Sequence, residues 1–116
     1  MSTENKISST VYCTLQYEAL HNWPTCDIDE VDFLKYPHRH MFHIKAFKKV
    51  DHDDRDIEFI VLKRKIARYL GEKYNHDFGP MSCEMIAREL IDTFNLSACD
   101  VSEDNENGCF LQKEDL

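Results

Sequence analysis

The chain has 116 residues, 42% of them hydrophobic and 31% charged, which are the proportions of one globular domain with a modest core. Its 22 acidic residues outnumber its 14 Lys and Arg residues, and the resulting net charge of −8 argues against a broad nucleic-acid-binding surface. No stretch is long and apolar enough to span a membrane, and residues 1–10 lack the apolar region of a signal peptide. We therefore expect a single cytoplasmic domain over residues 1–116, with loose tails at about 1–8 and 113–116.

Alternation of apolar and polar residues predicts two strands in the first half of the chain. Residues 11–19 alternate strictly, and a second alternating stretch runs from about 40 to 50. Residues 22–37 lie between them, begin with Trp-Pro and are acidic, so they read as a long loop with room for one helical turn. Loops of that length inside a small domain are often functional.

Helical spacing of apolar residues dominates the next part of the chain. It predicts a helix over about 57–73 and a second helix that begins after the N-cap residue Ser82. Two short strands follow, at 97–102 and 108–112, joined by a turn-rich hairpin connection. The predicted order is strand, strand, helix, helix, strand, strand.

The pattern His-Arg-His at 38–40 opens the second predicted strand. Residues two apart share one face of a strand, so His38 and His40 point the same way and supply half of a tetrahedral metal site. His21 follows the first strand, and pairing of the two strands brings three imidazoles together with one position open, as in catalytic zinc sites. The alternative is that these are solvated or hydrogen-bonded histidines at a strand entrance, which is the commoner fate of an isolated H-x-H pattern.

The five cysteines are an odd number without the close-paired spacing of a metal or redox motif. In a reducing compartment they should be thiols. Cys13, Cys83 and Cys99 fall within apolar patterns and are most simply small core residues.

Two motifs around the histidines resemble those of the 6-pyruvoyltetrahydropterin synthase and 6-carboxytetrahydropterin synthase family. Residues Tyr17 to His21 are similar to the pattern Phe/Tyr-Glu/Ser-Ala-Ala-His that ends the first strand of that family. Residues His38 to Phe42 are similar to His-Gly-His-Asn/Ser-Phe/Tyr, which opens its second strand.

Three further motifs follow in the family's order. Glu58 to Lys63 is similar to Asp-Phe-x-x-Leu-Lys at the start of the first helix, and Met81 to Ala87 is similar to Pro-Thr-Ala/Ser-Glu-x-Leu-Ala at the start of the second. Val101 to Asp104 resembles Val-x-Glu-Thr on the third strand. The resemblance covers about residues 11–112, nearly the whole chain.

The resemblance implies a fold, a cofactor and a substrate. The fold is α+β, the T-fold, a four-stranded antiparallel sheet with two helices packed on one face. The family's zinc ligands fall on His21, His38 and His40, and Glu103 takes the place of the carboxylate that holds the pterin ring through two hydrogen bonds. The family acts on 7,8-dihydroneopterin triphosphate, and its members are homo-oligomers, typically hexamers.

The catalytic residues depart from the family pattern. The family's catalytic Cys lies a few residues before the H-x-H motif, whereas the nearest thiol here is Cys26, twelve residues before His38. The family's Asp-His proton relay has only His76 and Asp77 as counterparts, in reversed order.

Three functions therefore stay open from the sequence. The first is the zinc-dependent synthase, with Cys26, His76 and Asp77 moving protons. The second is a catalytically inactive relative that binds or sequesters a pterin-, guanine- or nucleotide-like ligand. The third is a metal-stabilised structural or interaction module that binds no small ring compound.

Overall fold

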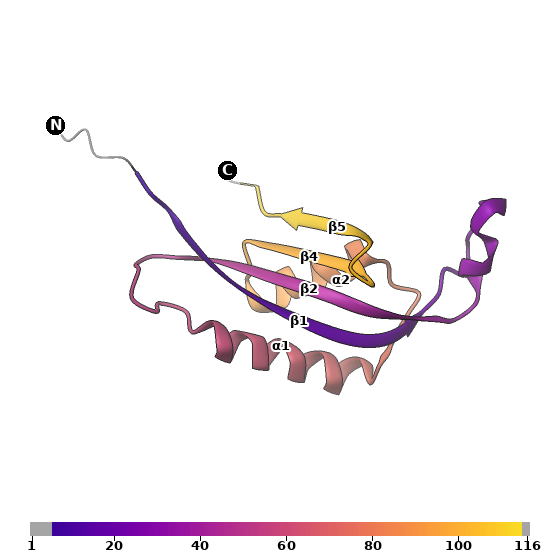
Figure 1. Cartoon of the computed structure of the whole chain (residues 1–116), viewed down its shortest axis with the longest axis horizontal. Coiled ribbons are helices and arrows are strands. Elements are labelled where there is room, and N and C mark those ends of the chain that lie inside the picture. The colour runs from indigo at the N-terminus through magenta and orange to yellow at the C-terminus, as the bar shows by residue number, and fades with distance from the viewer. Residues whose placement is uncertain (1–5, 115–116) are drawn as a thin grey trace.

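The computed structural model describes residues 6–114, and there the chain forms one mixed sheet, two α-helices and a short 3-10 helix (Figure 1). The strands are β1 (Ser9–His21), β2 (His38–Val50), β3 (Asp77–Gly79), β4 (Ala98–Glu103) and β5 (Asn107–Gln112). The helices are η1 (Asp29–Lys35), α1 (Phe59–Tyr74) and α2 (Cys83–Phe94). The strand order is β3-β1-β2-β4-β5, with β3 parallel to β1 and the other neighbours antiparallel.

The expected four-stranded antiparallel T-fold is wrong. The sheet of the described residues has five strands and is mixed, and a third helix, η1, lies in the segment that reads as a loop. Strand β3 is three residues long, too short for alternation to reveal it, and backbone hydrogen bonds from Leu20 N to His76 O and from Asn22 N to Gly79 O attach it to the end of β1. The four predicted strands and both predicted α-helices are present.

Strands β1 and β2 form a long antiparallel ribbon at the centre of the sheet, between β3 and β4. Each has 13 residues, and the register runs from the pair Ser9 and Val50 to the pair His21 and His38. Side chains on one face of this ribbon are buried beneath the helices, and cross-strand rows such as Leu15, Ile44 and Val101 continue that face into β4. Helix α1 packs against β1, and α2 packs against β4 and β5.

The core between the sheet and the helices holds the largest fully buried side chains. Burial of each such side chain stabilises the fold by about 1.5–3 kcal/mol relative to exposure. They are Phe42, Ile44, Ile66, Leu70, Ile86, Leu90, Leu96, Val101 and Cys99. None of the helices in the described part of the chain is long and apolar enough to cross a membrane.

A carboxylate braces the two α-helices against each other. Glu89 of α2 accepts hydrogen bonds from the hydroxyls of Tyr69, at 2.8 Å, and Tyr74, and Lys73 Nζ lies 3.1 Å from the same carboxylate oxygen. Burial opposes ionisation of Glu89, but the hydrogen bonds from Tyr74 and Tyr69, together with Lys73, outweigh burial and lower the pKa of Glu89.

This brace predicts an acid-sensitive contribution to stability. Because the pKa of Glu89 is lower in the folded state, its contribution is present above the unfolded value of about 4.3 and is lost as the pH falls through the folded value. Urea unfolding between about pH 6 and pH 3 should therefore show a smaller loss of stability in Glu89→Gln than in the wild type. The exposed Glu72→Gln on α1 is the control and should follow the wild type.

Candidate metal centre

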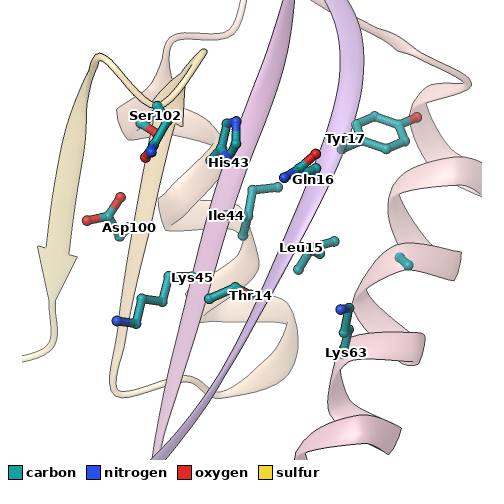
Figure 2. A pocket seen from close by; sticks show the side chains of 12 residues that line it. Thr14, Leu15, Gln16, Tyr17, His43, Ile44, Lys45, Lys63, Asp100 and Ser102 are labelled. Carbon is teal, nitrogen blue, oxygen red and sulfur yellow. The ribbon is translucent and has the colours of Figure 1, made fainter.

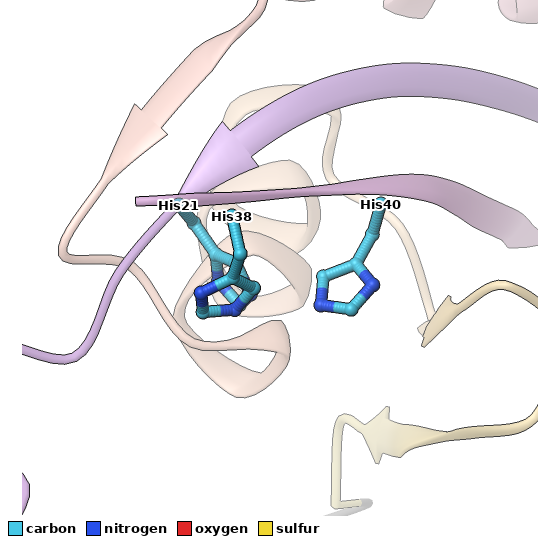
Figure 3. A group of neighbouring side chains, drawn as sticks. All are labelled: His21, His38 and His40. Atoms are coloured by element: carbon cyan, nitrogen blue, oxygen red, sulfur yellow. The ribbon is translucent and has the colours of Figure 1, made fainter. Parts of the chain in front are cut away.

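Three imidazoles converge where the β1–β2 ribbon ends (Figure 3). His21 and His38 are cross-strand partners, and His40 lies two residues further along β2 on the same face. The ring centroids of His21 and His38 are 4.5 Å apart, those of His38 and His40 4.9 Å, and those of His21 and His40 5.2 Å. The prediction that strand pairing brings the three rings together is confirmed.

The Nδ1 atom of each ring is held by an oxygen acceptor. His21 donates to the Met81 carbonyl at 2.9 Å, His38 to the Tyr36 carbonyl at 2.8 Å, and His40 to the Asp104 carboxylate at 2.7 Å. A carbonyl or carboxylate oxygen only accepts, so the proton of each neutral ring lies on Nδ1 and the lone pair on Nε2. Oxygen acceptors bonded in this way to the second ring nitrogen orient the imidazoles of metal-ligating histidines.

The Nε2 atoms are the atoms left for a metal ion. All three are buried, and within residues 6–114 none has a hydrogen-bond partner. One ligand atom from each ring lies within 4.8 Å of the others. A buried polar atom without a partner costs about 1–3 kcal/mol, so three of them facing one another fit a site built for a cation. His21, His38 and His40 are therefore close enough, and correctly oriented, to hold a metal ion.

Glu103, the last residue of β4, adds a negative charge to the cluster. Its Oε2 lies 3.0 Å from His21 Nε2 and its Oε1 3.5 Å from His40 Nε2. The contact with His21 lowers the pKa of Glu103 despite its partial burial, and the charges of His40 and His38 add to the effect. Burial lowers the pKa of His21, but Glu103 and the Met81 carbonyl outweigh it and leave that pKa raised. The lowered pKa of Glu103 and the raised pKa of His21 both favour a cation, either a proton or a metal ion, between these side chains.

A pocket of about 440 Å³ opens beside the imidazoles. Its lining includes His21, His38 and Glu103, the half-exposed Trp23 and the thiol-bearing Cys83 at the start of α2. Burial, followed by the charge of Glu103, raises the pKa of the Cys83 thiol to about 12, so this group is protonated at neutral pH. The pocket thus combines a potential metal, a carboxylate acceptor, an aromatic side chain and a proton-bearing thiol.

The structure places Cys26 in the loop around η1. Its side chain is 3% exposed, and its Sγ approaches the carbonyl oxygens of Ile28 and Val31 at 3.8 and 3.6 Å. Cys26 does not belong to the lining of the pocket beside the histidines. These contacts are those of a thiol that packs and closes a loop.

His76 and Asp77 lie at the outer edge of the sheet, where β3 begins. The His76 ring stacks on Tyr17 at a centroid distance of 4.7 Å and contacts the Glu18 carbonyl through Nδ1. Asp77 accepts a hydrogen bond from Gly79 N at 2.8 Å. Neither residue lines the pocket, so the structure does not bring the three expected proton carriers to the histidine cluster.

Asp104 and Cys83 are the site residues that the sequence reasoning missed. Asp104 stands where the family motif has Thr, and its carboxylate accepts from both His40 Nδ1 and Met41 N, so it ties the ring to the backbone of β2. The only signal in the sequence is an acidic residue directly after Glu103. Cys83 lies inside an apolar helical stripe, a position typical of a core residue.

A second hollow is lined by residues of β1, β2 and β4, together with Lys63 and Ala67 of α1 (Figure 2). Its volume is about 720 Å³, and polar side chains that alternate with the buried ones line it, among them Gln16, His43, Lys45, Asp100 and Ser102. His43 therefore points away from His40, as the alternation of the strand predicts.

Comparison with known proteins does not assign the chain. No protein-family model matches it, and no curated protein matches its sequence.

Proposed function

We propose that this protein binds zinc through His21, His38 and His40 and acts in the cytoplasm on a pterin substrate, 7,8-dihydroneopterin triphosphate, as a carbon–oxygen lyase similar to the 6-pyruvoyl- and 6-carboxytetrahydropterin synthases. The observation that carries the proposal is the arrangement of the three rings, with each Nδ1 held by an oxygen and each buried Nε2 left without a hydrogen-bond partner among the described residues. Zinc commonly takes three imidazole ligands in catalytic sites, where it polarises a substrate oxygen as a Lewis acid.

Other residues of the site would orient the metal ligands and bind the pterin ring. Asp104 and the Met81 carbonyl orient the rings of His40 and His21, which keeps their lone pairs directed at the metal position. Glu103 offers a carboxylate to the paired N–H and NH2 groups of a pterin edge, and Trp23 forms an apolar wall of the same pocket.

The residues proposed to move protons differ from those expected from the sequence. The proposal for Cys26, His76 and Asp77 gains no support from their positions, because none of them lines the pocket. Cys83 does line it and carries a proton at neutral pH. Among the described residues of this pocket wall, it is the thiol available to a bound substrate.

Incubation of the zinc-loaded protein with 7,8-dihydroneopterin triphosphate tests the proposal. Chromatography with fluorescence detection should show loss of the substrate and formation of a 6-substituted tetrahydropterin, alongside an active synthase as positive control. His40→Ala should be inactive under the same conditions, because it removes one of the three ligands. If the zinc-loaded wild type leaves the substrate unchanged while the positive control converts it, the lyase assignment is wrong.

A second candidate function is binding without catalysis. It is favoured by the lining of the pocket, which includes none of the three expected proton carriers. In that case a pterin-, guanine- or nucleotide-like compound raises the melting temperature of the zinc-loaded protein without being converted, since a ligand present at about 100 times its Kd stabilises the folded state by about 2.7 kcal/mol. The absence of any such shift, together with the absence of turnover, would leave a metal-stabilised module.

The resemblance also implies a homo-oligomer, and the two exposed edges of the sheet, β3 and β5, are the places where a second copy would pair.

A further inference from the structure

The position of Glu103 is set by the sheet. Glu103 ends β4 and is the cross-strand partner of Phe42, so its side chain lies on the same face as Phe42 and His40. A backbone hydrogen bond of 2.8 Å from Asp104 N to Met41 O ties the end of β4 to β2 directly beside the histidine cluster. The carboxylate is therefore carried by regular structure rather than by a loose loop.

The distances from this carboxylate to the rings fit shared coordination. Oε2 lies 3.0 Å from His21 Nε2, and Oε1 lies 3.5 Å from His40 Nε2. In a tetrahedral zinc site, with zinc-to-ligand distances of about 2.0–2.2 Å, neighbouring donor atoms lie roughly 3.3–3.6 Å apart. The His40 contact falls within this range, and the His21 contact is slightly shorter. The carboxylate oxygens thus already stand near the separation that two ligands of one ion adopt.

A hydrogen bond accounts for these contacts only where a ring carries a second proton, on Nε2. Both Nε2 atoms are without an aligned hydrogen-bond partner despite the short distances. Their Nδ1 atoms already donate, to Met81 O and to Asp104, so in the neutral rings Nε2 presents a lone pair rather than a hydrogen. Two lone pairs, each with an oxygen of the same carboxylate 3.0 or 3.5 Å away, form a donor set that suits a cation, and the side chain of Glu103 is only 28% exposed.

We propose that Glu103 is the fourth protein ligand of the metal ion, so that the ligand-free protein holds a closed site of three histidines and one carboxylate. This inference rests on the metal site of the proposed function and deepens it. Glu103 cannot at once bind the metal and receive the N–H and NH2 groups of a ring compound. A ligand that takes Glu103 therefore frees a coordination position, and one of its own oxygens can occupy it.

The test uses the full chain loaded with Co²⁺, whose visible absorption reports changes in its ligands, and azide as a competing small anion. The closed site of the wild type should bind azide weakly. Glu103→Gln removes the charged ligand and should bind azide at least about 10-fold more tightly, and its Co²⁺ affinity should fall by about 10-fold or more, the lower range seen when groups supporting a metal are removed.

Two matched variants separate ligation from charge. Glu106→Gln removes a carboxylate from the exposed turn after β4 and should leave the spectrum and azide affinity as in the wild type. Glu103→Asp keeps the charge but shortens the reach, so it should behave like Glu103→Gln if Glu103 is a ligand and like the wild type if only its charge matters.

Besides a wild-type-like Glu103→Asp, two results would overturn the inference. If the wild type binds one Co²⁺ and takes azide as tightly as Glu103→Gln does, the fourth position is open and Glu103 is not a ligand, while the metal site of the proposed function stands. If the wild type binds no metal, the inference and the proposed function fail together.

Discussion

Replacing His40 with alanine should abolish stoichiometric metal binding. The wild type should purify with, or take up, one metal ion per chain, because three convergent Nε2 atoms are buried and without hydrogen-bond partners in the described residues. His40→Ala leaves two imidazoles and also releases Asp104, which accepts from the His40 ring at 2.7 Å. Elemental analysis of the purified proteins measures the effect, which should be a fall from one equivalent to near zero.

The chain supplies a matched control for this substitution. His43 lies on the same strand, three residues further on, and points to the opposite face into the polar hollow. His43→Ala should therefore retain one metal ion per chain. Equal metal content in His40→Ala and His43→Ala would contradict the three-histidine site, and so would a wild type that holds no metal.

Replacing Phe42 with alanine should cause the largest loss of stability among the site variants. The Phe42 side chain is fully buried, and its ring centroid lies 5.0 Å from that of Phe78 and 5.2 Å from that of His21. Truncation of a buried Phe to Ala costs about 3–5 kcal/mol, which is a large part of the 5–15 kcal/mol that stabilises a typical domain. Urea unfolding of metal-free protein measures the change.

The same substitution should also weaken metal binding. Phe42 packs against the rings of both His21 and His40, so the cavity left by alanine removes a support that holds these ligands in place. The control is Phe33→Ala on η1, because the Phe33 side chain is 62% exposed. This substitution should change the free energy of unfolding by less than about 0.5 kcal/mol. A loss of stability in Phe42→Ala no greater than in Phe33→Ala would show that the core beneath the cluster is not packed as described.

The predictable part of the site depends on the two-residue period of a strand. His38 and His40 share a face wherever β2 lies in the sheet, and this holds before any tertiary contact is known. Adding His21 required only that β1 and β2 pair as an antiparallel ribbon, which the alternation of both segments favours. The helices were predictable for a similar reason, because their apolar stripes repeat over several turns.

The parts that were missed depend on contacts between segments far apart in the chain. Strand β3 has three residues and exists because the end of β1 offers it backbone hydrogen bonds. Cys26 had the residue type expected of a catalytic thiol but not the position, since its Sγ is engaged with the carbonyls of the η1 loop. Residue type and order cannot distinguish these cases, because the nearest neighbours are set by the packing of the whole chain.

The sequence of this protein thus specifies its strands, its helices and the shared face of its histidine pair, because these follow from local periods of 2 and 3.6 residues. Strand β3, the oxygen acceptors of Met81 and Asp104 that hold two imidazoles, and the approach of Glu103 to two imidazoles emerge only when the sheet and the helices assemble. The physical reason is that each of these features joins residues about 60 or more positions apart, and only the complete core holds such residues at hydrogen-bond or coordination distance.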